Sequence, residues 1–260
     1  MGKRRNSALR KEQEQFTMIS NKQNHAFYQK HTTRDDSNTI NFGQAKQKKP
    51  INLIPKTVNQ EQYILALQNA STDIVVVSGP AGTGKTYLAM LAAIKALRSK
   101  EYDRIVLTRP AVGVDDEKHG FLPGDLNAKM EPWTRPLLDV LREFYTSKEV
   151  EYMLEEQIVE ISPLAFMRGR TFKNSFIILD EGQNATPSQV KMLLTRIGVG
   201  SKIVVTGDTD QADRKAAENG LMDLRDKLKA KTVNGIECCE FDHRDIQRHR
   251  IIGDVLRLYR

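Results

Sequence analysis

The chain has 260 residues, of which 39% are apolar, so it can bury a substantial core. This composition excludes a fibrous or wholly disordered protein. The formal net charge is +7, and residues 1–50 carry all of this excess, with 11 Lys and Arg against 4 Asp and Glu.

The expected compartment is the cytoplasm. The two cysteines, Cys238 and Cys239, are adjacent and cannot form a disulfide framework, which indicates a reducing environment. The apolar runs, such as residues 74–77, are far shorter than the roughly 20 residues of a membrane span. No apolar run follows the N-terminal charges as it would in a signal peptide, so we expect no membrane association.

Residues 1–50 form the first predicted unit, a basic and flexible N-terminal arm. Only 12 of these 50 residues are apolar, and the segment is rich in Gln and Asn. Such an arm can bind nucleic acid by releasing counterions from phosphates. A solvated extension with no partner is the alternative.

Residues 51–260 form the second predicted unit, in which short β-branched runs alternate with longer helical stretches. The runs are nearly continuous in apolar residues, as in strands that are buried on both faces of a parallel sheet. This alternation predicts one α/β domain with a doubly wound, mostly parallel sheet. The predicted strands are Ile74–Ser78, Arg104–Thr108, Val159–Ser162, Phe176–Asp180, Ile203–Thr206 and Ile236–Phe241, and the predicted helices are 60–70, 84–98, 135–156, 187–197, 217–230 and 245–258.

A complete phosphate-binding loop, GPAGTGKT at residues 79–86, lies between the first strand and the following helix. Its glycines let consecutive backbone N–H groups face phosphates at the positive end of a helix. Lys85 is expected to reach the β- and γ-phosphates and Thr86 to bind Mg²⁺. The loop therefore predicts a nucleoside triphosphate site formed by Gly79, Pro80, Ala81, Gly82, Thr83, Gly84, Lys85 and Thr86.

Two adjacent carboxylates end the buried strand in FIILDEGQN, residues 176–184. We expect Asp180 to hold Mg²⁺ through its water shell and Glu181 to polarise the water that attacks the γ-phosphate. The turn at Gly182 can bring both side chains to the nucleotide. An ordinary acidic turn is the alternative.

A third strand ends in GDTDQ, which places Asp208 and Gln211 near the same carboxyl edge. Gln211 can contact the γ-phosphate or the lytic water, or the segment is a polar loop with a helix cap. No N-K-x-D element for reading guanine follows the phosphate-binding loop. The adjacent Asp and Glu favour hydrolysis over small-molecule kinase chemistry.

Seven blocks in order, VVSGPAGTGKTYLA, TRPAV, GFLPGDL, MRGRTF, FIILDEGQN, TRIGVGSKIVVTGD and DIQRH, closely resemble the PhoH-like family of P-loop ATPases, in the short form often carried by bacteriophages. The resemblance covers residues 57–259. It implies a single RecA-like core similar to the first motor domain of superfamily 1 helicases. It also implies binding and hydrolysis of ATP, a link to RNA or to phosphate starvation, and assembly into rings such as hexamers.

The resemblance also suggests an adenine-reading element at Asn59, Gln60 and Tyr63, because a Gln amide can bond the adenine edge in two places. A helix N-cap at Thr57 or Asn59 is the alternative. The sequence departs from the family after Asp208, since Asp210, Arg214 and Lys215 replace the usual residues. An additional carboxylate near the γ-phosphate would repel it unless a cation intervenes, which puts the role of Gln211 in doubt.

An arginine often offsets the charge on a transferring phosphoryl group. With one nucleotide-binding core in the chain, a neighbouring copy would supply it, and a ring closes such a head-to-tail contact. Arg170 and Arg248 are preferred, and a surface ion pair is an equally good explanation of each. The candidates are Arg168, Arg170, Arg196 and Arg248.

A long irregular segment rich in Gly and Pro follows Arg109, and loops of this length are usually functional. In motor ATPases this edge meets nucleic acid, so its side chains can contact phosphates or stack on a base. Trp133 fits core packing better. The residues considered are Arg109, Lys118, His119, Lys129 and Trp133.

These features together favour a Mg²⁺-dependent ATPase with RNA or single-stranded nucleic acid as its macromolecular partner. The alternative is an ATP-switched nucleic-acid-binding or scaffold protein with negligible turnover.

Overall fold

A six-stranded sheet is the centre of the computed structural model, which describes residues 49–110, 135–211, 218–247 and 251. Its strand order is β3-β2-β4-β5-β1-β6, and every pairing is parallel. The strands are β1 (Ile74–Ser78), β2 (Arg104–Arg109), β3 (Val159–Pro163), β4 (Ser175–Leu179), β5 (Lys202–Gly207) and β6 (Ile236–Glu240). Each predicted strand is therefore confirmed, with ends that differ from the prediction by at most one residue.

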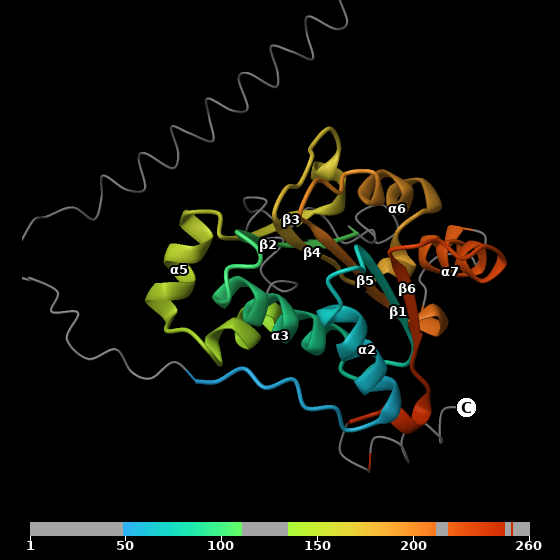
Figure 1. Cartoon of the computed structure of the whole chain (residues 1–260), viewed down its shortest axis with the longest axis horizontal. Helices are drawn as coiled ribbons and strands as arrows, with labels where there is room; N and C mark the ends of the chain where they lie inside the picture. The colour runs from blue at the N-terminus through green and yellow to red at the C-terminus, as the bar shows by residue number, and fades with distance from the viewer. Residues whose placement is uncertain (1–48, 111–134, 212–217, 248–250, 252–260) are drawn as a thin grey trace, which may run out of the picture. The chain divides into compact units, whose positions relative to one another are not determined.

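Helices cover both faces of the sheet, as Figure 1 shows. Helices α2, α3 and α5 share one apolar cluster, and helices α6 and α7 contribute to the other. The helices are α2 (Val58–Gln68), α3 (Lys85–Arg98), α5 (Ser147–Glu155), α6 (Pro187–Leu194) and α7 (Gly220–Ala230), and residues 135–142 are also helical. The predicted doubly wound α/β fold is confirmed.

Successive side chains of a strand point to opposite faces of the sheet, and this explains the two apolar clusters. Val75 and Val77 of β1 pack in the cluster with α2 and α3, whereas Ile74 and Val76 pack in the other. All residues of β1, β4 and β5 are buried. Strands covered on both faces therefore need the nearly continuous apolar runs that the sequence contains.

The predicted helix 135–156 was wrong, because the structure breaks it in two. Thr146 accepts a hydrogen bond from the Glu149 backbone N–H, and the Glu149 side chain accepts one from the Thr146 N–H. This capping box starts α5 at Ser147. The helix expected from 245 also does not begin there, since His243–Asp245 is a short 3₁₀ turn and residues 246 and 247 are not helical.

Several predictions fall on residues outside the described ranges. They include almost all of the arm 1–50, most of the helix 245–258, and the side chains Lys118, His119, Lys129, Trp133, Arg214, Lys215 and Arg248. In the part of the chain that is described, no helix combines the length and the apolar character needed to cross a membrane.

A buried lysine joins the sheet to the end of α2. The Lys202 ammonium donates to the carbonyl oxygens of Leu67 and Asn69, both at 2.8 Å, and more distantly to Ala66 at 3.4 Å. It thereby bonds carbonyls that the helix end leaves without intrahelical donors. Burial lowers the pKa of this ammonium.

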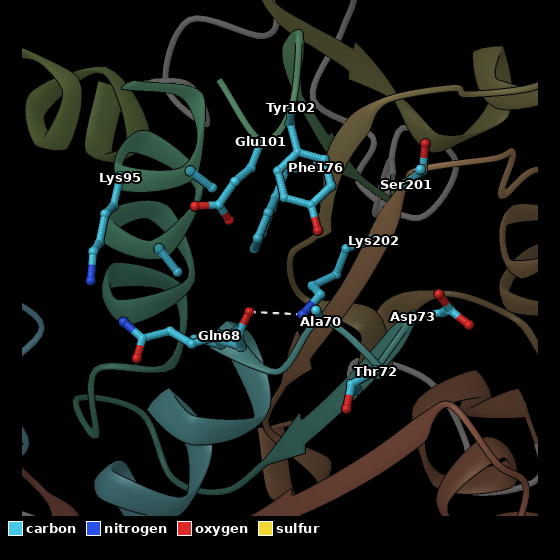
Figure 2. A pocket seen from close by; sticks show the side chains of 14 residues that line it. Gln68, Ala70, Thr72, Asp73, Lys95, Glu101, Tyr102, Phe176, Ser201 and Lys202 are labelled. Atoms are coloured by element: carbon cyan, nitrogen blue, oxygen red, sulfur yellow. Dashed lines mark hydrogen bonds between the residues drawn. The ribbon is translucent and has the colours of Figure 1, made fainter. Parts of the chain in front are cut away.

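The same lysine lines a cavity of about 430 Å³ at the amino edge of the sheet, opposite the phosphate-binding loop. Figure 2 shows Lys202 and the Tyr102 hydroxyl pointing into it. Tyr102 packs edge-on against Phe176, with ring centroids 5.4 Å apart. Because Lys202 bonds the helix end, its contribution to this cavity wall is structural.

Replacing Lys202 with Met should lower the free energy of unfolding by about 1–3 kcal/mol, because the carbonyls at the end of α2 lose a charged donor. Urea denaturation measures the difference. Lys95→Met, at an exposed position that lines the same cavity, is the control and should stay within about 0.5 kcal/mol of the wild type. Equal stability of Lys202→Met and the wild type would contradict this role.

Candidate nucleotide-binding and hydrolytic site

The phosphate-binding loop follows β1 and lies against the carboxyl ends of β5 and β6. Gly79 has a φ of +147°, and a Cβ there would lie 2.5 Å from the Phe241 carbonyl oxygen. Its N–H donates to the Gly207 carbonyl at 3.2 Å. Gly84, with a φ of +85°, is the N-cap of α3. Only glycine meets both requirements, close approach at Gly79 and a left-handed backbone at Gly84.

The Lys85 ammonium lies inside this loop. It donates to the carbonyls of Gly79 at 2.6 Å and Pro80 at 2.8 Å, and the residue is 8% exposed. The Thr83 hydroxyl donates to the same Pro80 carbonyl at 2.9 Å. The loop thus encloses a positive charge at the N-terminus of α3, an arrangement that suits phosphate.

Gln60 of α2 supports the loop from outside. Its side-chain amide donates to the Thr83 carbonyl at 3.0 Å and accepts from the Lys56 N–H at 2.8 Å. The Thr57 hydroxyl caps α2 by accepting from the Gln60 N–H. The N-cap alternative is therefore correct for Thr57. Adenine reading by Gln60 stays a prediction, and both ends of its amide already bond the protein.

The C-terminal segment also contacts the loop. The Gln247 N–H donates to the Gly82 carbonyl at 2.9 Å. Buried Asp245 accepts from the Asn59 side chain at 2.8 Å. Tyr63 packs edge-on against Phe241, with ring centroids 5.6 Å apart. Asn59 and Tyr63 thus contact the C-terminal segment that follows β6.

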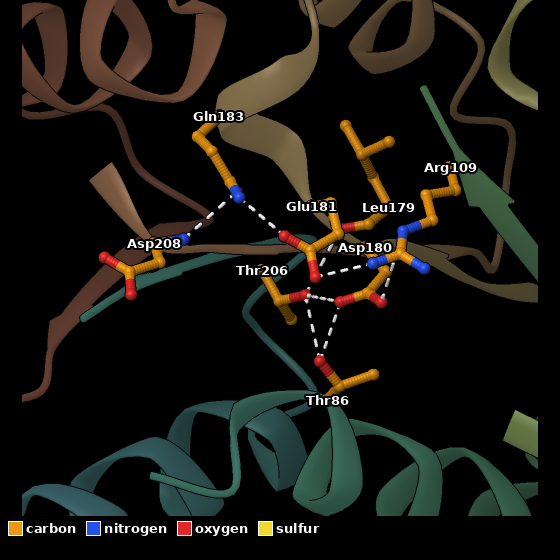
Figure 3. Close-up of polar contacts among 8 residues, drawn as sticks. All are labelled: Thr86, Arg109, Leu179, Asp180, Glu181, Gln183, Thr206 and Asp208. Atoms are coloured by element: carbon orange, nitrogen blue, oxygen red, sulfur yellow. Dashed lines mark hydrogen bonds and ion pairs between the residues drawn. The ribbon is translucent and has the colours of Figure 1, made fainter. Parts of the chain in front are cut away.

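Asp180 lies between two threonine hydroxyls (Figure 3). Its Oδ1 accepts from Thr86 Oγ1 at 2.7 Å and from Thr206 Oγ1 at 2.8 Å. A hydroxyl and a carboxylate oxygen in contact are hard oxygen ligands of the type that Mg²⁺ prefers, with water and phosphate oxygens completing its shell. The donor set of Thr86 and Asp180 therefore fits a magnesium ion.

Glu181 has an unusual backbone and two side-chain partners. Its φ of +54° lies in the left-handed region, which costs a non-glycine residue energy. Its Oε1 accepts from Arg109 Nη2 at 2.6 Å, and its Oε2 accepts from Gln183 Nε2 at 2.5 Å. Arg109 Nε also lies 4.0 Å from Asp180 Oδ2. The left-handed backbone conformation places the Glu181 side chain at the same carboxyl edge of the sheet as Asp180.

Gln183 connects Glu181 to the phosphate-binding loop. Its Oε1 accepts from the Asp208 N–H at 3.0 Å, and Asp208 Oδ2 accepts from the Ala81 N–H at 3.0 Å. The Gln183 residue is 1% exposed, and a Cβ at Gly207 would lie 2.4 Å from its Oε1. A continuous chain of hydrogen bonds therefore runs from Glu181 to the loop.

The structure brings together the loop residues, Asp180, Glu181 and Asp208. It leaves the Gln211 side chain exposed, while the Glu181 oxygens bond Arg109 and Gln183. The roles of Gln211 and Asp208 toward nucleotide stay predictions.

The arginines separate into different environments. Arg170 forms two hydrogen bonds with the Glu160 carboxylate, one of them at 2.7 Å, and these raise its pKa. It also stacks 4.6 Å from the Phe172 ring centroid. Arg168 is exposed, and Arg196 is half-buried. The surface ion pair that the sequence left open is present for Arg170.

Sequence reasoning missed three contacts at this site. It gave no role to Thr206 or Gln183, and it assigned Arg109 to nucleic acid without its partner Glu181. The available signals were the Thr that precedes Gly207 and Asp208 at the end of β5 and the Gln two residues after Glu181. Neither residue's position in the sequence indicates which side chain that residue contacts.

A cavity of about 270 Å³ opens beside these groups. Its lining includes Thr86, Arg109, Asp180 and Glu181. The remaining wall is formed by Tyr87, Met90, Pro136, Leu137 and Val140. The acidic pair is thus open on one side to a partly apolar space.

A parallel sheet whose first strand leads into a glycine-rich phosphate-binding loop, with β5 between β1 and the strand β4 that immediately precedes Asp180, defines a P-loop nucleoside triphosphatase fold. A family model described as "PhoH-like protein" matches residues 52–260. The chain belongs to the PhoH-like protein family.

Two relatives illustrate this membership. The PhoH-like protein of Bacillus subtilis (strain 168) is 45% identical over 205 residues, which are 78% of this chain and 63% of that protein. Protein PhoH of Escherichia coli (strain K12) is 37% identical over 210 residues, which are 80% of this chain and 58% of that protein. The chain thus spans about three-fifths of the length of the curated relatives it matches.

The solved structures that resemble this chain are less similar to it in sequence than these relatives are. The Sulfolobus solfataricus SWI2/SNF2 ATPase core in complex with dsDNA has a TM-score of 0.40 and 12% identity, over 75% of this chain and 47% of that chain. The Pif1 helicase from Candida albicans has a TM-score of 0.37 and 17% identity, over 79% and 44%. Likeness at this level carries no functional argument.

Replacing Gln183 with Leu should lower the free energy of unfolding by about 1–3 kcal/mol, because the Asp208 N–H loses its acceptor in a buried position. Chemical denaturation measures this difference. Gln68→Leu, at an exposed position of α2, is the matched control and should change stability by less than about 0.5 kcal/mol. A loss no larger than that of the control would show that the Gln183 bridge contributes nothing.

Proposed function

We propose that the protein is a Mg²⁺-dependent ATPase that acts on, or is regulated by, RNA or single-stranded nucleic acid. The contact between Thr86 and Asp180 at 2.7 Å, beside a complete phosphate-binding loop, is the observation that carries the ATPase assignment. It joins the loop to the acidic strand end, as metal-dependent phosphoryl transfer requires.

Each residue has a distinct role in this proposal. The loop amides and Lys85 hold the phosphates, and Thr86 and Asp180 hold the metal. Bound Mg²⁺ supplies positive charge that offsets the phosphate oxygens. Glu181 accepts a proton from the attacking water, and Gln183 keeps its carboxylate oriented.

The nucleic-acid part of the proposal rests on charge. Residues 1–50 hold the whole excess of +7, and a segment of this composition can neutralise backbone phosphates. Binding through such an arm is independent of base sequence, since phosphate contacts carry no sequence information. The arm therefore fits a nucleic-acid backbone of any base sequence.

Assembly of identical copies is the third part of the proposal. One nucleotide-binding core would take its arginine from a neighbour, and a closed ring repeats that contact. Arg170 already neutralises Glu160 within its own chain, so its transfer across an interface would break an ion pair. This favours Arg248 of the two preferred candidates.

Glu181→Gln tests the assignment of the base. The amide keeps the size of the side chain but cannot accept the proton, so ATP hydrolysis should fall by about 100-fold or more while ATP binding is retained. Steady-state phosphate release and nucleotide titration measure the two properties. Glu156→Gln, an exposed change at the end of α5, is the control and should hydrolyse ATP at the wild-type rate.

Normal hydrolysis by Glu181→Gln would remove Glu181 from this role. The same assay separates the proposal from a rival in which the protein is an ATP-switched nucleic-acid-binding or scaffold protein. Turnover that stays negligible with and without a single-stranded oligonucleotide, in a protein that binds ATP, would favour that rival.

A further inference from the structure

The Glu181 carboxylate is held from two sides that differ in exposure. Its Oε2 bonds Gln183, which is 1% exposed and fixed by the Asp208 N–H. Its Oε1 bonds Arg109, whose side chain is 29% exposed. One contact therefore belongs to the buried framework, whereas solvent and solutes can reach the other.

The ion pair with Arg109 opposes the role proposed for Glu181. The Arg109 Nη2 atom lies 2.6 Å from Oε1, so a lone pair of this oxygen accepts the Arg109 N–H. The lone pair of Oε1 that accepts from this N–H cannot at the same time accept from a water molecule. Gln183 bonds only Oε2, so it can keep the carboxylate in place and leave Oε1 free for water.

Arg109 has a side chain suited to a phosphate. A guanidinium bonds two oxygens of a phosphate in a planar, charge-assisted arrangement. Arg109 ends β2 and lines the cavity of about 270 Å³ beside the acidic pair, together with Tyr87 and Leu137. A phosphodiester group at this opening can compete with Glu181 for the same N–H groups.

We propose that Arg109 is a positioning residue that restrains Glu181 until a phosphodiester group of a bound single strand draws the guanidinium away. Strand binding then frees Oε1 for the lytic water, while Gln183 retains Oε2. This inference rests on the proposed ATPase function. In this proposal, one exchange of ion-pair partners couples nucleic-acid binding to ATP hydrolysis.

Arg109→Ala in the full chain tests the restraint. ATP hydrolysis without nucleic acid should rise by about three- to fivefold, the factor expected from breaking one partly exposed ion pair. Oligo(U) and oligo(dT) should stimulate the wild type by a similar factor and should leave the variant unchanged. A methylphosphonate oligomer, which lacks backbone charge, should stimulate neither protein.

Binding gives a second measurement that does not depend on turnover. Fluorescence anisotropy with labelled oligo(U) should show affinity reduced about five- to tenfold in Arg109→Ala and a salt slope smaller by about one. Arg109→Lys keeps the charge without the planar fork and should restore part of the stimulation. ATP affinity should be the same in all three proteins.

Arg142→Ala is the matched control. Arg142 is 50% exposed and lies 3.4 Å from Asp139, in the helical residues 135–142, and its loss should change neither hydrolysis nor stimulation. The proposal is overturned if Arg109→Ala hydrolyses ATP at or below the wild-type rate, if oligo(U) still stimulates it, or if no oligonucleotide stimulates the wild type. Absence of hydrolysis in the wild type would instead refute the proposed function.

Discussion

Parallel pairing brings the carboxyl ends of β1, β2, β4 and β5 to one edge of the sheet. The residues that follow these ends are the phosphate-binding loop, Asp180 and Asp208, and Arg109 is the last residue of β2. Residues separated by more than 100 positions in the chain therefore come within hydrogen-bond distance of each other, as Thr86 and Thr206 do beside Asp180. A strand paired in the opposite direction would place its terminal residue at the far edge.

Glu181 shows how local strain and long-range packing cooperate. A left-handed non-glycine residue persists only when its surroundings hold it, and here Gln183 and Arg109 hold the side chain. Gln183 in turn needs the glycine at 207, because a side chain there would displace its oxygen. The acidic residue proposed to activate water is thus tied to β2, β5 and the phosphate-binding loop together.

Much of the fold could be predicted because buried parallel strands require short continuous apolar runs, and Ile74–Ser78 has its exact predicted ends for this reason. Residues 79–86 and 180–181 were predicted because their chemistry is local to a motif. The break before α5 was missed, since helical periodicity across 135–156 outweighed the capping box of Thr146 and Glu149. The Arg109 partner could not be predicted, because the sequence does not say that β2 lies beside β4.

Calorimetric titration of the 260-residue chain with ATP, in the presence and absence of Mg²⁺, is the most direct measurement. We expect saturable binding at one site, tighter with the metal, and its loss in Lys85→Ala, because the loop then lacks the charge that Gly79 and Pro80 surround. A folded wild-type protein that binds no adenine nucleotide with the metal present would contradict the assignment of the loop, and with it every role given to Asp180 and Glu181.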